Sequence, residues 1–160
     1  MSAERVFIGL GANLGDAGAA LTQALQELAA LPGTRMVARS PLYRSAPVDA
    51  TGPDFVNAVA ELNTDLEPLP LLHALQAIER QHGRQRSYRN APRTLDLDLL
   101  LYGQRVLNEP TLTVPHPRLH QRAFVLLPLL ALAPDLRHPL LGPVAAMSAA
   151  VQGQAIERLP

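Results

Sequence analysis

The sequence has no cysteine among its 160 residues, and its fourteen basic residues are all arginine, with no lysine. The absence of cysteine excludes disulfides, a thiolate nucleophile and zinc bound by cysteine. The absence of lysine excludes a P-loop phosphate site and Schiff-base catalysis. Whole classes of covalent and nucleotide chemistry are therefore removed at the outset.

Long apolar runs and a charge imbalance are also missing. No stretch of about 18 apolar residues is present, and the N-terminus lacks the pattern of a secretory signal. The formal net charge is zero, so the overall field does not steer the chain to nucleic acid. With 48% hydrophobic residues, the chain is expected to form one domain over residues 1–160. We expect a cytoplasmic monomer that binds neither membrane nor nucleic acid.

The most informative stretch is 92–102, where Asp96 and Asp98 alternate with leucines. Side chains along a strand alternate between two faces, so both aspartates are expected on one face. The leucines expected on the opposite, core face are Leu95, Leu97, Leu99 and Leu101. This strand therefore combines a chemical face with a core face.

Two carboxylates at positions i and i+2 of a strand have Cα atoms roughly 6.5 to 7 Å apart. Mg²⁺ fits such a pair, because it takes one or two carboxylates together with substrate phosphates. Arg93, just upstream, has the bidentate geometry that suits a phosphate. The alternative is an edge strand whose aspartates face water, although the flanking leucines favour an interior strand.

The remaining pattern predicts an α+β protein, a ferredoxin-like α/β sandwich with helices packed on a mainly antiparallel sheet. Asp16 is the expected N-cap of the first helix, which stops at Pro32-Gly33. Gly9, Gly11 and Gly15 do not have the spacing of a dinucleotide fingerprint. Strands are expected at 5–10, 36–43 and 55–64, a hairpin at 103–107, and helices at 17–31, 69–81, 123–133 and 144–151.

Phe55 and Asn57 are expected on the same face of their strand. An aromatic ring beside an amide suits a flat heterocycle, which can stack on the ring and form hydrogen bonds with the amide. A core phenylalanine with an incidental asparagine is an equally valid interpretation of the same two residues.

An arginine-rich segment precedes the aspartates, since five of the fourteen arginines fall between Arg80 and Arg93. Their like charges repel and the segment offers little to bury, so a loop is expected. Arginines leading into a carboxylate pair are typical of phosphoryl transfer, where they neutralise phosphate oxygens. An RNA-binding or simply solvated loop is the alternative, although RNA recognition favours more aromatic residues than Tyr88 alone.

His116 lies between Pro115 and Pro117, outside any regular element. It is either a phosphate ligand or a structural histidine. Arg122 precedes an apolar helix, and a helix N-terminus is a favourable place for anions. Residues 134–160 contain no pattern that indicates chemistry.

Five segments together resemble the 6-hydroxymethyl-7,8-dihydropterin pyrophosphokinase family. The likeness covers about residues 5–135, and its most specific part is Pro-Arg-Thr-Leu-Asp-Leu-Asp. The segments are 8–15, 42–45, 55–58, 92–98 and 114–117.

The resemblance implies transfer of diphosphate from ATP, the co-substrate, to a pterin hydroxymethyl group in folate synthesis. Asp96 and Asp98 would bind two Mg²⁺ ions and, with Arg84 and Arg93, form the catalytic set. The residues implied to bind the nucleotide are Leu72, Gln76, Arg86, Leu99, Thr113, His116 and Arg122. Those implied to bind the pterin are Ser45, Ala46, Val48, Phe55, Asn57, Glu79 and Phe124.

Two alternatives remain open at this point. One is a metal-dependent nucleotidyltransferase or glycosyltransferase with a D-x-D motif, which would release pyrophosphate or use a sugar nucleotide. The other is a non-enzymatic, ferredoxin-like RNA-binding module, whose affinity would depend on salt and survive loss of both aspartates.

Overall fold

Two long strands, β1 (Glu4–Ala12) and β4 (Phe55–Thr64), run antiparallel through the centre of the computed structural model, which describes residues 3–13, 16–46, 54–83 and 95–160. β5 (Asp96–Tyr102) pairs with β1, while β2 (Thr34–Arg39) and β3 (Tyr43–Ser45) both pair with β4. β10 (Ile156–Arg158) adds to β3. The sheet order β10-β3-β4-β1-β5 confirms the antiparallel, ferredoxin-like α+β prediction.

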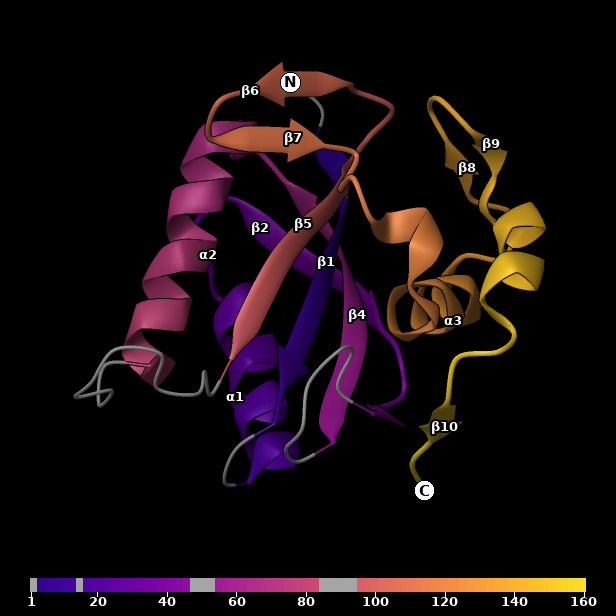
Figure 1. Cartoon of the computed structure of the whole chain (residues 1–160). Coiled ribbons are helices and arrows are strands. Elements are labelled where there is room, and N and C mark those ends of the chain that lie inside the picture. Colours follow the sequence, from indigo (N-terminus) through magenta and orange to yellow (C-terminus); the bar gives the residue numbers. More distant parts are fainter. Residues whose placement is uncertain (1–2, 14–15, 47–53, 84–94) are drawn as a thin grey trace.

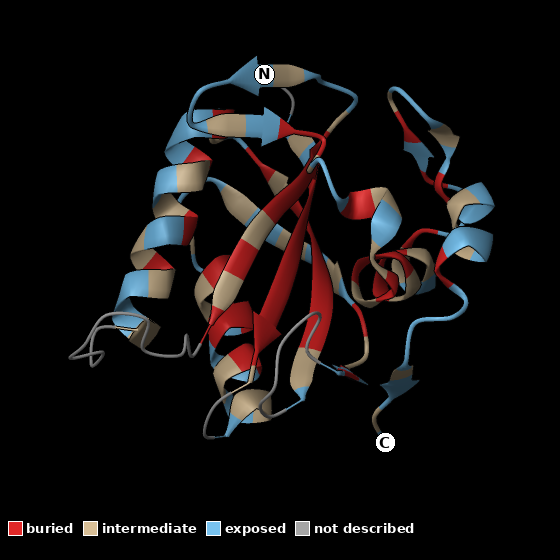
Figure 2. Cartoon of the chain, in the orientation of Figure 1, coloured by how far each residue is buried: buried red, intermediate tan, exposed pale blue. Residues whose placement is uncertain are grey.

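Three helices cover the two faces of this sheet (Figure 1). α1 (Ala17–Ala29) and α2 (Pro68–Gly83) pack on one face, and α3 (Ala123–Leu132) packs on the other. The central strands are therefore buried from both sides, and in Figure 2 they are coloured as buried along most of their length. This explains why β1 is buried at every position from Val6 to Ala12 instead of alternating.

Local sequence signals determine where α1 begins and which of its faces is buried, as predicted. Asp16 caps it, since its carboxylate accepts a hydrogen bond from Ala19 N at 3.0 Å. Leu21, Leu25 and Leu28 recur at helical spacing and are buried against the sheet. The helix begins four residues before Leu21 and ends before Gly33, whose φ of 60° no regular helix accommodates.

The single strand predicted over 36–43 is wrong, because two strands flank a break at Ser40 and Pro41. Ser40 Oγ accepts a hydrogen bond from Val59 N at 3.0 Å and donates one to Pro41 O at 2.7 Å. Proline has no N–H for a strand ladder. The ladder along β4 is therefore shared between β2 and β3.

The predicted hairpin at 103–107 is displaced along the chain. Gly103, with φ of 55°, makes a turn after β5, but the paired strands are β6 (Leu107–Glu109) and β7 (Leu112–Val114). The hairpin turn therefore falls at 110–111.

The C-terminal third packs around α3. It contains the 3₁₀ helix η1 (Leu119–Gln121), the strand pair β8 (Arg137–His138) and β9 (Gly142–Pro143), and a second 3₁₀ helix, η2 (Val144–Val151). The short helix predicted over 144–151 is thus present with 3₁₀ geometry. Val144 and Val151 are buried in the core cluster that also holds α3. Within the described ranges, no helix has the length and apolar character needed to cross a membrane.

The α1 side of the core offers a stability test. Leu21 is fully buried there, and Leu21→Ala should reduce the free energy of unfolding by about 2 to 5 kcal/mol, because the cavity left behind adds to the lost transfer energy. Leu69→Ala on α2 is the control, since Leu69 is 41% exposed. Urea denaturation measures both, and equal losses would show that Leu21 does not contribute to a packed core.

Candidate active site

Two glycines of β1 form the floor of a cavity on the sheet face that α3 shares. Gly11 pairs with Asn57 on one side and Asp96 on the other, and Gly9 pairs with Asp98. Paired residues present their side chains on the same face, so the acids and the amide flank a strip without side chains. A Cβ on Gly11 would lie 3.2 Å from Asn57 Nδ2, so a larger residue would press on that amide.

The cavity has a volume of about 790 Å³. Its walls come from β3, β4, β5, the segment from η1 into α3, and residues 154–155. A cavity of this size is typical of a site that holds small organic molecules.

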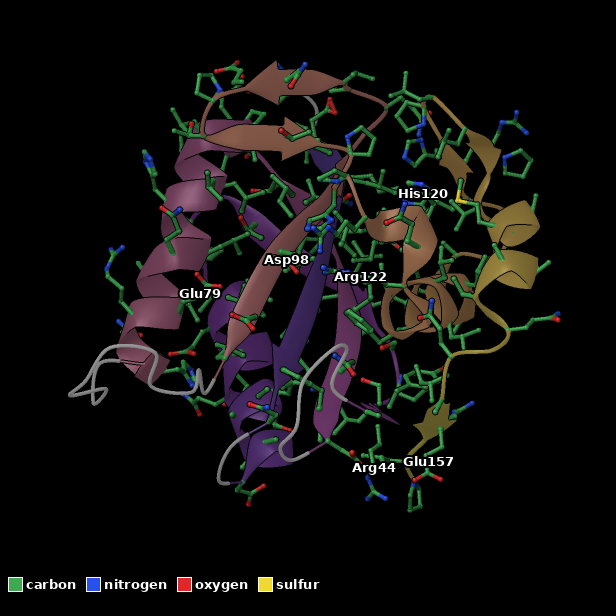
Figure 3. The ribbon with its side chains drawn as sticks, in the orientation of Figure 1. Arg44, Glu79, Asp98, His120, Arg122 and Glu157 are labelled. Atoms are coloured by element: carbon green, nitrogen blue, oxygen red, sulfur yellow. The ribbon has the colours of Figure 1, made fainter. Side chains whose placement is uncertain are left out.

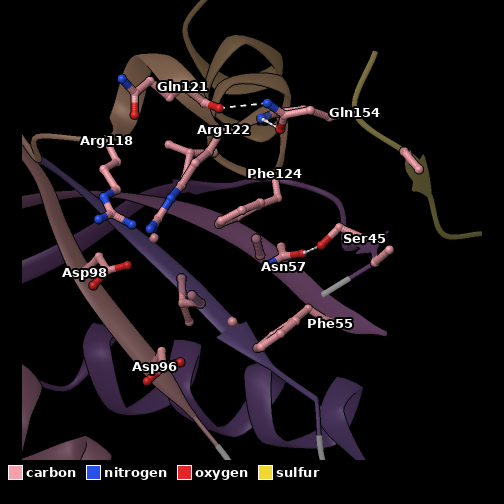
Figure 4. A pocket seen from close by; sticks show the side chains of 18 residues that line it. Ser45, Phe55, Asn57, Asp96, Asp98, Arg118, Gln121, Arg122, Phe124 and Gln154 are labelled. Carbon is pink, nitrogen blue, oxygen red and sulfur yellow. Dashed lines mark hydrogen bonds between the residues drawn. The ribbon is translucent and has the colours of Figure 1, made fainter. Parts of the chain in front are cut away.

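Asp96 and Asp98 both line the cavity, as the alternation predicts (Figure 4). Both are half-buried, while Leu97 between them is buried on the opposite face. The two carboxylates therefore point into one space from one strand. Their positions on a paired strand hold them there without support from a loop.

The predicted placement of Leu101 with the other leucines is wrong. The register shifts so that Ile8 pairs with Leu99 but Phe7 pairs with Leu101, which leaves Leu100 as an extra residue. Such a β-bulge reverses the alternation beyond it. Leu100 and Leu101 therefore both join the core cluster beside α3.

The expectation of an interior strand is also wrong, since β5 is the last strand of the described sheet. Its outer edge is occupied by other groups. Glu79 of α2 accepts a hydrogen bond from Leu97 N at 2.7 Å, and His116 N donates one to Leu100 O at 2.9 Å. These contacts satisfy polar groups that an edge strand would otherwise leave for water or another chain.

Phe55 and Phe124 bring two aromatic rings to the cavity, from β4 and α3. In Figure 4 their rings lie on either side of Asn57. Asn57 is only 4% exposed. The arrangement forms a slot with aromatic sides and an amide at its base, which suits a flat polar heterocycle.

Asn57 is oriented by Ser45 on the neighbouring strand. Ser45 Oγ donates a hydrogen bond to Asn57 Oδ1 at 2.6 Å, and both residues are buried. The amide nitrogen is therefore on the side of Gly11, where it can donate into the cavity.

Arg118 and Arg122 supply positive charge opposite the aspartates. Both line the cavity, and in Figure 4 their guanidinium groups extend toward Asp98. Arg122 Cζ lies 5.3 Å from the centroid of the Phe124 ring, a cation–π contact that helps to hold the guanidinium over the ring. Arg122 is also the N-cap residue of α3, at the positive end of that helix.

His116 is not among the residues that line the cavity, but it lies close enough to Asp98, Arg122 and Arg118 to interact with their charges. Burial lowers the pKa of His116; Asp98 opposes that shift, while Arg122 and Arg118 add to it. Its Nδ1 accepts a hydrogen bond from Arg118 N at 3.2 Å, which assigns the proton to Nε2. The imidazole can therefore donate through Nε2–H at neutral pH.

The carboxylates are the possible metal ligands in this cavity. Among the residues that the structure describes, no three His, Asp, Glu or Cys side chains gather as a complete metal cluster. Asp96 and Asp98 alone match the donor set of Mg²⁺, which takes few carboxylates and fills its remaining positions with phosphate oxygens and water. The residues present therefore fit a metal that arrives together with a phosphate ligand.

The other predicted site residues fall into three groups according to their positions in the structure. Ala46 lines the cavity with Ser45, whereas Glu79 lies at the outer edge of β5. Four of the seven residues expected to bind the nucleotide lie on β5 or on the elements beside its outer edge, outside the cavity lining: Leu72 and Gln76 on α2, Leu99 on β5 and Thr113 on β7. Those outside the described residues are Val48, Arg84, Arg86 and Arg93.

Sequence reasoning missed several cavity residues. Gly9 and Gly11 had a usable signal, because glycines two apart on a strand leave one face empty. Arg118 had a weaker one, its proximity to His116. Gln121 and Gln154 had none, because their positions depend on a contact between segments about thirty residues apart.

Comparison with known proteins gives consistent matches. A family model described as 7,8-dihydro-6-hydroxymethylpterin-pyrophosphokinase (HPPK) matches residues 7–134. A curated Pseudomonas aeruginosa protein named 2-amino-4-hydroxy-6-hydroxymethyldihydropteridine pyrophosphokinase is 51% identical over 158 residues, which are 98% of each chain. A Pneumocystis carinii protein named folic acid synthesis protein fol1 is 40% identical over 140 residues, covering 87% of this chain and 19% of that protein.

Solved structures agree on the fold. A crystal structure of Plasmodium falciparum HPPK-DHPS, wild type, matches 93% of this chain with a TM-score of 0.75. This chain spans 45% of that one, at 14% sequence identity, so the likeness shows the fold alone.

Proposed function

Because this chain belongs to the 7,8-dihydro-6-hydroxymethylpterin-pyrophosphokinase family, we propose that its cavity binds the pterin and the reacting end of ATP together, with Mg²⁺ held by Asp96 and Asp98. The chain is a pyrophosphokinase of folate synthesis. It transfers diphosphate from ATP to 6-hydroxymethyl-7,8-dihydropterin, giving AMP and the pterin diphosphate. The observation that carries the site proposal is that one cavity contains both the carboxylates and the aromatic slot.

The pterin occupies the slot between Phe55 and Phe124. Its rings stack on the two aromatic faces, and the Asn57 amide forms hydrogen bonds with its polar edge. Ser45, the last residue of β3, and Ala46, which follows it, close the slot on that side. We assign Glu79 to positioning β5 through Leu97 N, in addition to any contact with the substrate.

The phosphates lie toward Arg118, Arg122 and His116. The guanidinium groups form charge-assisted hydrogen bonds with phosphate oxygens, and His116 donates from Nε2. The positive end of α3 points to the same region. The nucleoside would extend toward the outer edge of β5, near α2 and β7. The residues predicted to contact it there are Leu72, Gln76, Leu99 and Thr113.

In the reaction, the pterin hydroxyl oxygen attacks the β-phosphorus in line. A new O–P bond forms as the bond between the β-phosphorus and the bridging oxygen of AMP breaks, and the hydroxyl proton is released. The chain orients the two reactants and surrounds the developing charge with fixed cations. Mg²⁺ bound by the aspartates would neutralise phosphate oxygens and lower the pKa of the attacking hydroxyl.

Product analysis tests this proposal. Incubation with ATP, Mg²⁺ and the reduced pterin alcohol should give equal amounts of AMP and pterin diphosphate, and chelation with EDTA should abolish both. Free pyrophosphate as the product would favour a nucleotidyltransferase. RNA binding without any turnover would contradict an enzymatic function altogether.

Arg118 gives a prediction that the family resemblance did not. Arg118→Gln should lower kcat/KM for ATP about 10-fold, as expected for one charge-assisted hydrogen bond at a partly exposed site. Steady-state kinetics with varied ATP measures the change. Arg35→Gln is the control, because Arg35 is exposed on β2 and lies outside the cavity lining. If both variants behave alike, Arg118 does not contact the phosphates.

A further inference from the structure

The segment 154–159 begins at the cavity, where Gln154 contacts the start of α3, and continues as β10 beside β3. Gln154 and Ala155 line the cavity, and β10 follows immediately on the edge of β3 (Figure 1). Sequence analysis assigned no chemistry to this part of the chain. It also lies beyond residue 134, where the match to the family model ends.

Gln154 brackets Arg122 from both sides. Its Oε1 accepts a hydrogen bond from Ala123 N at 2.9 Å, and its Nε2 donates one to Gln121 O at 2.8 Å (Figure 4). One side-chain amide therefore joins the peptide groups immediately before and after Arg122. These bonds fix the backbone at the point where η1 ends and α3 begins.

Gln154 also provides a hydrogen-bond partner for a backbone N–H group at the start of α3. The first N–H groups of an α-helix have no partner within the helix, and Arg122 offers no side-chain cap. Gln154 takes the first of these groups, Ala123 N, from outside the helix. The Arg122 side chain, which has no acceptor with which to cap these groups, extends over Phe124 and toward Asp98.

The rest of the segment 154–159 is held in place by contacts that do not involve the Gln154 side chain. Ile156 pairs with Ser45, and Leu159 N donates a hydrogen bond to Leu42 O at 2.9 Å. Arg44 forms an ion pair with Glu157 at 2.9 Å, and the two side chains lie next to each other in Figure 3. Losing the Gln154 amide should therefore leave β10 in place. The effect of Gln154 on Arg122 can then be separated from attachment of the tail.

We propose that Gln154 is a positioning residue that sets Arg122 for binding the phosphates of the nucleotide. Gln154 acts through the backbone on either side of Arg122. The proposal rests on the proposed function, since it takes the phosphates of ATP as the ligand of Arg122. It predicts that the two residues contribute to nucleotide binding as one unit.

The experiment is a double-mutant cycle on nucleotide binding. Gln154→Met keeps the length of the side chain and removes both hydrogen bonds, and it is made alone and together with Arg122→Ala. Isothermal titration of a non-hydrolysable ATP analogue with Mg²⁺ gives Kd for each variant. Gln152→Met is the matched control, because Gln152 is exposed two residues away and does not line the cavity.

We expect Gln154→Met to weaken nucleotide binding about 10-fold in the otherwise unchanged chain. The reason is that a small displacement of the Arg122 guanidinium from the phosphates is costly. It should change Kd less than about twofold when Arg122 is already alanine. Unchanged binding by Gln154→Met, or equal losses in both backgrounds, would overturn the proposal.

Two further measurements keep the result decisive. Urea denaturation reports whether Gln154→Met folds; if it does not, Gln154→Glu, which keeps the acceptor for Ala123 N and loses the donor to Gln121 O, takes its place in the cycle. Product analysis of the unchanged chain tests the proposed function independently of the binding measurements. Absence of AMP there would refute the proposed function while leaving the binding cycle interpretable.

Discussion

Asp98→Asn is expected to lower kcat by at least about 10³-fold, by comparison with the loss of single electrostatic stabilisers in other active sites. The amide keeps the size of the side chain but removes the charge that would hold Mg²⁺ against the phosphates. Pterin binding without nucleotide should change little, because the proposed pterin contacts, Asn57 and the two phenylalanine rings, lie on β4 and α3 and not on β5. Steady-state assays of AMP formation measure kcat.

Asp135→Asn is the control for this variant, since Asp135 is exposed in the turn after α3. A direct metal readout completes the test. Binding of Mn²⁺ in the presence of a non-hydrolysable ATP analogue, followed by electron paramagnetic resonance, should be lost with Asp98→Asn and retained in the control. Near-normal turnover by the Asp98 variant would remove the metal assignment.

Asn57→Ala is expected to weaken pterin binding about 100-fold. A buried amide that binds a ligand through hydrogen bonds contributes strongly, because its loss leaves polar groups of the bound ligand without a partner. The hydroxyl of Ser45 also loses its acceptor, Asn57 Oδ1. Quenching of pterin fluorescence on titration with protein gives the dissociation constant.

Asn63→Ala provides a matched control on the same strand. Asn63 pairs with Arg5 at the far end of β4 and does not line the cavity. Nucleotide affinity should be unchanged in both variants. If Asn57→Ala binds the pterin as well as Asn63→Ala does, the slot between the phenylalanines is not the pterin site.

Much of the fold follows from signals that act within a few residues. The period-two pattern located β4 at Phe55–Thr64 and placed Asp96 with Asp98, and the Asp16 cap marked the start of α1. Such features depend on backbone geometry and on neighbours in sequence, so they are visible without the tertiary structure.

The errors arise where distant segments decide the outcome. The bulge at Leu100 depends on how β5 meets β1, and the position of β5 at the sheet edge depends on which strands pair. The break at Ser40 had a local sign in Pro41, which the apolar pattern around it outweighed. Bulges and edges have weak local signatures because their cause is a partner strand.

The site divides in the same way. The carboxylates, Phe55 and Asn57 follow from alternation, whereas the assignment of Phe124 and Ser45 to the site required the family resemblance. The contact of Gln154 with the start of α3 was inaccessible to either, because nothing near it in the chain indicates a partner thirty residues away.

The order of the strands along the chain has a consequence for biosynthesis. Five strands of the main sheet are complete by Tyr102, but the last residues that line the cavity are Gln154 and Ala155. On the ribosome, the scaffold can therefore assemble before the residues that finish the pocket have been translated. A nascent chain would therefore be able to pair these strands before it gains the residues that complete the place for substrate.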